Sequence, residues 1–392
     1  MLPRLVVVIL TLAGTVAVHA QPAPARLTLT REIVIDGEAE ALNSFWTIAV
    51  NRDGRVIVPQ VREGQFRVYD SRGRRIGIFG RTGRGPGEFD QAVTEFGWHG
   101  DTIWVHDPNQ RRITFMSPSL QLLRTQPWSE FPKNAPPSDP RAGPLYVRFN
   151  RLYRDGSQLG QLPFGPPDPE SGFRTDLRFV ILDASGTITS HVAKIPPATG
   201  RVYLPQMRGL GADVPFAARP AIAVSADGER IGVAVAQAPS GSRGSYVVTV
   251  VRRTGDTVLS RTYAYTPERI PAKAKSDALD QMDRRLRRFA TEGPDAGRMP
   301  VDQIMAKVRP LVPDTYQPLR DIQFGADDTV WLQLNDTNPR PRYRMLDGRG
   351  SVVGDVVLPE RSMLGAATRT QLWIIEMTQD GVPSLVRYRI SG

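Results

Sequence analysis

Residues 45–79 read FWTIAVNRDGRVIVPQVREGQFRVYDSRGRRIGIF and contain four short segments rich in apolar or alternating residues. These segments are 45–50, 55–59, 65–69 and 75–79, and they are separated by an Asp-Gly turn, a polar loop and a Ser-Arg-Gly turn. Short alternating segments joined by glycine turns are typical of antiparallel strands that follow one another along the chain. The stretch therefore predicts a four-stranded meander.

The same pattern recurs along the rest of the chain. Its first strands begin near residues 45, 94, 147, 220, 319 and 363, and the sixth copy stops one strand short. Residues 26–35 form a lone alternating segment that can pair beside 385–390, complete the last copy and leave no free sheet edge. We therefore predict an all-β, six-bladed β-propeller over residues 26–392, with four-stranded antiparallel blades and a last blade closed by the N-terminal strand. The alternative is a β-sandwich followed by a second β domain.

One gap between copies is twice the usual spacing. About 100 residues separate the first strands of the fourth and fifth copies, and residues 271–310 within this gap carry apolar side chains at helical spacing, for example Leu279, Met282 and Leu286. We predict a small helical insertion between blades 4 and 5. Because links between blades run across one face of a propeller toward the central channel, we expect this insertion to cap the channel mouth. The alternative is a packing insertion that covers exposed blade edges.

Two stretches carry a family resemblance. Residues 80–89 read GRTGRGPGEF, and residues 103–115 read IWVHDPNQRRITF. The first resembles the linker of NHL-type repeats, and Asp107, Asn109 and Arg112 fall on matching places of the repeat core. The chain is thus similar to six-bladed β-propellers of the NHL-repeat-like or TolB-like type over residues 45–116. The resemblance implies architecture, because this fold hosts lyases, lactonases, sugar binders and protein-interaction modules alike.

The N-terminus resembles a secretory signal. Arg4 supplies a positive charge, residues 5–18 are an apolar run, and Val18-His19-Ala20 is a small-x-small cleavage site. We predict a signal peptide over residues 1–20 and an exported protein, periplasmic or extracellular. No transmembrane segment is expected after cleavage, because no other run is apolar and long enough.

Composition excludes several kinds of site. The chain has no cysteine, which removes disulfides, thiolate zinc sites and a cysteine nucleophile, and only four histidines are present. The formal net charge is +10, which favours anionic partners. No nucleic-acid motif accompanies this charge, so no nucleic acid is expected as a partner. We expect a monomer without a cofactor or a bound metal.

The candidate ligand-binding residues follow from the propeller topology. The residues just before each inner strand, and those in the loops between second and third strands, line the channel mouth. They are Trp46, Arg62, Glu95, Arg111, Arg148, Arg219, Arg320, Asp321 and Arg361. Several arginines at one mouth favour carboxylate, sulfate or phosphate groups, although some of them can instead pair with Glu95 and Asp321. Trp46 either stacks on a sugar or aromatic group or belongs to the core between blades.

These observations lead to two hypotheses for function. The first is an exported binding module that holds an anionic small molecule, glycan or peptide, or a protein partner, at the capped channel face. The alternative is a metal-dependent lactonase-like hydrolase or an amidating-lyase-like enzyme at the channel. Oxygen ligands for a calcium ion would then come from Glu95, Asn43, Asp321 and Asn335.

Overall fold

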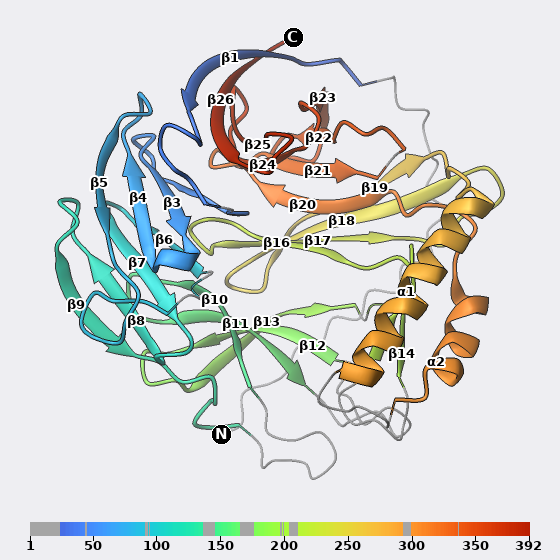
Figure 1. The fold of residues 1–392 in the computed structure, drawn as a ribbon, viewed down its shortest axis with the longest axis horizontal. Helices are drawn as coiled ribbons and strands as arrows, with labels where there is room; N and C mark the ends of the chain where they lie inside the picture. The colour runs from blue at the N-terminus through green and yellow to red at the C-terminus, as the bar shows by residue number, and fades with distance from the viewer. Residues whose placement is uncertain are drawn as a thin grey trace.

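The computed structural model describes residues 24–43, 45–90, 93, 95–135, 146–164, 176–196, 198, 200–203, 211–292, 299–335 and 337–392. The strands form six four-stranded antiparallel sheets arranged in a ring around a central axis (Figure 1). The chain is a six-bladed β-propeller, as the repeat pattern predicts. The expected signal peptide, residues 1–20, lies outside the described residues.

Each blade runs from an inner strand beside the channel to an outer strand at the rim. Blade 1 consists of β2 (Ala49–Val50), β3 (Val56–Gln60), β4 (Gln65–Tyr69) and β5 (Arg75–Phe79). Blade 2 consists of β6 (Glu95–His99), β7 (Thr102–Asp107), β8 (Arg112–Met116) and β9 (Leu122–Pro127). Blade 3 consists of β10 (Arg148–Leu152), β11 (Gln158–Phe164), β12 (Asp176–Leu182) and β13 (Ile188–Ile195). Blade 4 consists of β16 (Ala221–Val224), β17 (Arg230–Ala236), β18 (Gly244–Arg252) and β19 (Thr257–Tyr265). Blade 5 consists of β20 (Leu319–Phe324), β21 (Val330–Leu334), β22 (Arg342–Leu346) and β23 (Val352–Val357). Blade 6 consists of β24 (Ser362–Ala367), β25 (Gln371–Met377), β26 (Pro383–Ser391) and β1 (Thr28–Ile35).

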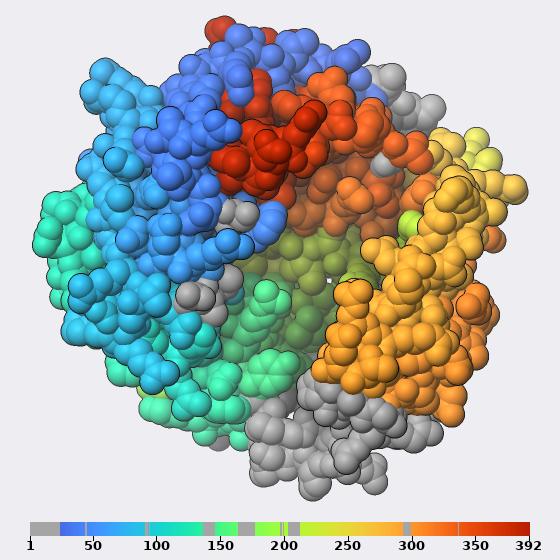
Figure 2. All heavy atoms as spheres, viewed as in Figure 1, coloured from blue at the N-terminus to red at the C-terminus, as the bar shows by residue number. Residues whose placement is uncertain are grey.

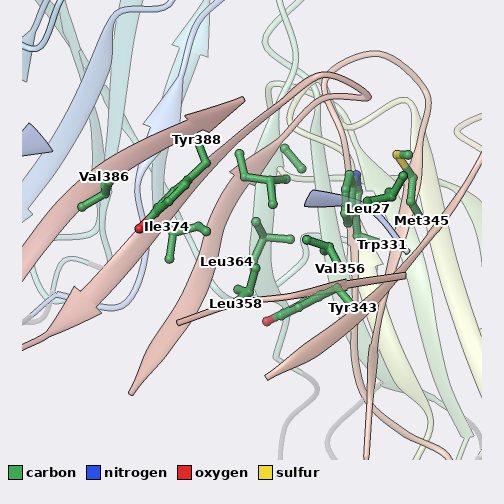
Figure 3. Close-up of a cluster of buried hydrophobic side chains, with 12 residues drawn as sticks. Leu27, Trp331, Tyr343, Met345, Val356, Leu358, Leu364, Ile374, Val386 and Tyr388 are labelled. Carbon is green, nitrogen blue, oxygen red and sulfur yellow. The ribbon is translucent and has the colours of Figure 1, made fainter. Parts of the chain in front are cut away.

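The two ends of the chain meet in blade 6. Strand β1 pairs antiparallel with β26, from Thr28 opposite Ser391 to Ile35 opposite Leu385. The prediction that the N-terminal strand closes the last blade is confirmed. Leu27, just before β1, is buried in the apolar cluster between blades 5 and 6, which Figure 3 shows with side chains from both blades. Burial of apolar side chains between neighbouring blades is the main favourable contribution to the free energy of folding.

Neighbouring blades are also joined near the channel by hydrogen bonds between their inner strands. Trp98 Nε1 donates to the Ala49 carbonyl at 3.2 Å, Arg151 Nε donates to the Ser225 carbonyl at 3.3 Å, and Gln323 Nε2 donates to the Leu364 carbonyl at 3.3 Å. The His99 ring nitrogen contacts the Leu152 carbonyl in the same way. Burial lowers the pKa of His99, which keeps the ring neutral, so one ring nitrogen donates a hydrogen bond. These bonds hold the inner strands in place relative to one another.

The helical insertion lies in the link between β19 and β20. It consists of α1 (Ala272–Glu292), α2 (Val301–Val308) and the short helix η2 (Arg309–Leu311), and it confirms the prediction of a small helical insertion. The helices pack on a hairpin that the sequence analysis did not predict, formed by β14 (Arg201–Tyr203) and β15 (Gly211–Asp213). The sequence signal for this hairpin is the spacing of about 73 residues between the first strands of the third and fourth copies, near 147 and 220, because the usual spacing is about 50.

The sequence analysis expected the insertion to cap the channel mouth, and the structure shows that it does not. Figure 2 shows a hollow at the centre of the face, and α1 borders it on one side. The apolar side chains of the helices, among them Met282, Ile304 and Val308, pack with Val202 and Val214 around the hairpin. Because this hairpin lies in the link between blades 3 and 4, it holds the helices over that side of the ring.

The GPGEF stretch that carries the family resemblance is held by its own polar contacts. Glu88 Oε2 accepts a hydrogen bond from the Gly85 amide at 2.6 Å, and Glu88 Oε1 accepts one from Arg81 Nε at 2.7 Å. The Gly85 amide and then Arg81 hold the pKa of Glu88 below its usual value. Arg112 Nη2 donates to the carbonyls of Gly85 and Glu88, both at 2.7 Å. A Cβ at Gly83 would lie 2.1 Å from Glu88 Oε2, so a larger residue there would displace the Glu88 carboxylate. The motif therefore has a structural role, and we call the contacts of Glu88 and Arg112 with this stretch the GPGEF clamp.

Removal of strand β1 should destroy the closed ring. A chain that begins at Asp36 exposes the free edge of β26 and loses the buried Leu27 and Ile35. We expect a lower thermal unfolding temperature and the appearance of oligomers on size-exclusion chromatography, because unpaired edges recruit other strands. A chain that begins at Pro24 is the matched control and should stay monomeric. A monomeric Asp36 chain with unchanged thermal unfolding would contradict the closure argument.

Loss of the clamp should lower stability. R112A removes three hydrogen bonds to the carbonyls of Arg84, Gly85 and Glu88, and we expect the free energy of unfolding to fall by about 2 to 3 kcal/mol in urea denaturation. The control R81Q removes an exposed ion pair and should change it by less than about 1 kcal/mol. Equal effects of the two variants would show that Arg112 is not the central residue of the clamp.

Candidate functional site

The candidate residues lie on one face of the propeller. Every inner strand begins at the face on which the links between blades run, and the loops between second and third strands turn at the same face. We call this the link face. It carries α1 and α2 and is hollowed at its centre (Figure 2).

Trp46 lies on the surface of the link face. Its neighbour Phe45 is fully buried in the core, whereas Trp46 is 66% exposed. Phe45 therefore anchors the segment before β2, and the indole ring of Trp46 remains accessible for stacking. The core alternative for Trp46 is wrong. Arg62, in the short helix η1 (Val61–Glu63) of the same blade, is also exposed.

Three further arginines are exposed on other blades. Arg111 ends the loop between β7 and β8 with a left-handed backbone (φ 52°), and Arg148 is the first residue of β10. Arg320 lies in β20 where the strand register shifts between Leu319 and Asp321, and such a bulge turns a side chain out of the regular alternation. Arg62, Arg111, Arg148 and Arg320 form no ion pair with any residue that the structure describes.

The other two candidate arginines have protein partners. Arg219 Nη2 forms an ion pair with Asp213 Oδ2 at 3.0 Å, and the Arg219 amide donates to Gln317 Oε1 at 3.1 Å. Arg361, with a left-handed backbone (φ 57°), donates from Nη2 to the Gln379 carbonyl at 3.3 Å. These contacts use some of the donors of each guanidinium group, so both side chains are less available to a ligand than the four unpaired arginines.

Glu95 lies in a cluster between blades 2 and 3. Its Oε2 atom is 3.6 Å from Nδ1 of His106, whose side chain is 3% exposed. The His106 ring stacks on Phe149 at 4.2 Å and contacts the edge of Trp128 at 4.3 Å. Burial lowers the pKa of Arg151, and the negative charge of Glu95 opposes that shift. Glu95 therefore belongs to a buried interblade cluster.

Part of this cluster was predictable from the sequence. The turn at 99–102 places Glu95 directly opposite His106 in the hairpin register, so the local strand pattern was sufficient for that pair. Arg151 comes from the next blade, and no local pattern indicates which blade surface it faces. Sequence reasoning missed Arg151 for that reason.

Asp321 is also partly buried. Burial raises the pKa of its carboxyl, and its Oδ1 accepts the Ile322 amide at 2.8 Å. No residue that the structure describes forms an ion pair with it. The alternative that arginines at the mouth pair with Asp321 is therefore not seen within the described part of the chain.

The oxygen ligands considered for calcium are dispersed. Asn43 Nδ2 donates to Glu63 at 2.8 Å, Asn335 lines a groove between blades 4 and 5, and Glu95 belongs to the cluster with His106. Across the described ranges, no group of three or more His, Cys, Asp or Glu residues is arranged to hold a metal ion. In the same ranges, no helix is long and apolar enough to cross a membrane.

No protein-family model and no curated protein matches the sequence. Among solved structures, a member of the DUF4221 family from Bacteroides vulgatus has 12% identity over 93% of this chain and 98% of that chain, with a TM-score of 0.49. The PQQ-bound aldose sugar dehydrogenase from Streptomyces coelicolor has 12% identity over 94% and 100% of the two chains, with a TM-score of 0.39. A streptogramin B lyase has 12% identity over 93% and 97%, with a TM-score of 0.36. At these identities the likeness concerns the fold alone.

Proposed function

We propose that the link face binds an anionic ligand, and that an acidic glycan fits it best. The observation that carries the proposal is the set of four exposed arginines, Arg62, Arg111, Arg148 and Arg320. They come from four different blades and form no ion pair with any residue in the described part of the chain. A guanidinium presents a planar fork of donors that matches a carboxylate or sulfate group.

Trp46 favours a glycan over a simple anion. An exposed indole ring provides a flat apolar surface on which a sugar ring can stack, and Trp46 is 66% exposed on the same face as the arginines. A chain of acidic sugars would offer both groups at regular spacing. The hollow at the centre of the link face, with α1 as one side, is where such a chain would lie (Figure 2).

The proposed ligand is consistent with export. Acidic glycans are found at cell surfaces and outside cells, and the sequence predicts cleavage of a signal peptide over residues 1–20. The net charge of +10 would steer anionic chains toward the protein, and the attraction would weaken as salt screens it.

Charge removal on the link face should weaken glycan binding. We expect the triple variant R62Q/R148Q/R320Q to bind oligogalacturonate or heparin oligosaccharides about 10- to 100-fold more weakly by isothermal titration calorimetry. The control R52Q/R72Q/R349Q removes the same charge from exposed turn residues at the opposite face and should bind normally. W46A should weaken binding about 5-fold. Equal loss in both triple variants would mean nonspecific charge attraction and would refute a site on the link face.

Metal content separates this proposal from the enzyme alternative. We expect elemental analysis of the dialysed, untagged mature protein to find no stoichiometric calcium or zinc. A content of about one calcium or zinc ion per chain would instead favour a lactonase-like hydrolase or an amidating-lyase-like enzyme. Variants of Glu95 and Asp321 would then be the first to examine.

A further inference from the structure

Two sides of helix α1 are used for packing within the helical insertion. Its apolar residues, among them Met282 and Leu286, pack on the β14–β15 hairpin. On the next side around the helix, Arg287 forms ion pairs with Asp283 at 2.8 Å and with Asp302 of α2 at 2.7 Å. The side of α1 opposite Arg287 is therefore the one that points away from α2.

The residues on that opposite side follow from the helical repeat. An α-helix turns by about 100° per residue, so Arg285 and Arg287 point about 200° apart. Residues three or four apart share one side of a helix. The side that carries Arg285 therefore also carries residues before and after it, and we call this set the inner flank of α1. It consists of Gln281, Arg285, Arg288, Phe289 and Glu292, and all five are exposed.

The inner flank faces the hollow of the link face. In Figure 1, α2 lies on the outer side of α1, farther from the centre of the ring. In Figure 2, α1 borders the central hollow. Because Arg287 points toward α2, the flank on the opposite side of α1 points toward the hollow.

The inner flank carries unpaired positive charge. Arg285 and Arg288 form no ion pair with any residue that the structure describes. Glu292, the last residue of α1, lies four residues after Arg288 but is not paired with it. Two unpaired guanidinium groups thus accompany one carboxylate, and the flank has a net positive charge.

The inner flank also carries an exposed aromatic ring. Phe289 is 38% exposed and does not belong to the apolar cluster of the helices around the hairpin. It lies one turn after Arg285, so a ring for stacking and a guanidinium are neighbours on one surface. The proposed glycan site has the same combination on blade 1, where Trp46 and Arg62 are both exposed. Figure 2 shows blade 1 and α1 on opposite sides of the hollow.

We propose that the inner flank of α1 is a second glycan subsite, so that an extended acidic chain binds across the hollow. The inference rests on the proposed function and adds a preference for long chains. One acidic sugar lies at Trp46 and Arg62, and a later sugar of the same chain stacks on Phe289 with its carboxylate at Arg285. Two features favour this occupant: its charge is complementary to the flank, and the flank continues the proposed site across the hollow.

Chain length is the property that such a second subsite controls. When one chain occupies two subsites, the second contact forms within the complex and adds to the affinity, provided that the chain can span both. A short oligosaccharide occupies one subsite only. Affinity should therefore rise once the chain is long enough to reach α1 from blade 1.

The test compares digalacturonate with decagalacturonate, each titrated into the mature protein by calorimetry. We expect decagalacturonate to bind at least about 10-fold more tightly. R285Q/R288Q should weaken decagalacturonate binding about 5- to 10-fold, F289A should weaken it about 3-fold, and neither should change digalacturonate binding. The thermal unfolding temperature should stay unchanged in R285Q/R288Q, because both side chains are exposed and unpaired.

The matched control is R284Q/R309Q, which removes the same charge from exposed positions on the other side of α1. The hydrogen bond from Arg287, together with the charges of Arg309 and Arg284, lowers the pKa of Asp283. Arg284 and Arg309 therefore lie closer to the α2 side than to the hollow. The control should bind both oligosaccharides as the unsubstituted protein does.

Two kinds of failure can be told apart. Equal affinity for the two lengths, or equal losses of decagalacturonate binding in R285Q/R288Q and R284Q/R309Q, would overturn the subsite on α1 and leave the proposed function intact. R62Q/R148Q/R320Q tests the proposed function itself and should weaken the binding of both lengths. No binding of either oligosaccharide at millimolar concentration would overturn both.

Discussion

The pairing of β1 with β26 is the interaction on which the rest of the structure depends. A propeller blade buries its apolar side chains only against its two neighbours, so six blades form a continuous core only when the ring is closed. The chain closes it with its two ends, through a register that runs from Thr28 and Ser391 to Ile35 and Leu385. The same closure brings Leu27 into the core between blades 5 and 6. With the ring closed, the inner strands are held by interblade hydrogen bonds such as that from Trp98 to Ala49, and the starts of all six inner strands meet at one face.

The surroundings of each arginine decide what it does. Arg112 donates to carbonyls of the GPGEF clamp and so stabilises the link that carries the family resemblance. Arg219 is paired with Asp213, and Arg151 is held at the buried junction of blades 3 and 4. Arg62, Arg148 and Arg320 are exposed on the link face. A guanidinium that already donates to protein oxygens has little to offer a ligand, whereas an exposed one keeps its full set of donors. This difference is the physical basis for placing an anionic ligand on the link face.

The helical insertion has a structural consequence beyond its own packing. Its helices rest on the β14–β15 hairpin, so two neighbouring links form one small apolar cluster that includes Met282, Ile304 and Val214. The base of the insertion, where Tyr316 pairs with Glu268, forms one side of the tyrosine-lined groove between blades 4 and 5. One insertion therefore borders the central hollow (Figure 2) and also forms one side of the groove between blades 4 and 5.

The sequence by itself determined the number of blades, the antiparallel order within each blade, the closing strand and the presence of a helical insertion. These features depend on local signals: alternation with a period of two, glycine turns and helical spacing of apolar residues. It also placed the nine candidate residues at strand starts and loops, because topology alone assigns those positions to one face. Only the tertiary structure decided that Trp46 is exposed, that Glu95 faces His106 and Arg151, that Arg219 is paired, and that Tyr246 and Arg344 meet in a groove. Those outcomes depend on contacts between blades that are distant in the chain, and strand periodicity does not specify which side chains meet across such a contact.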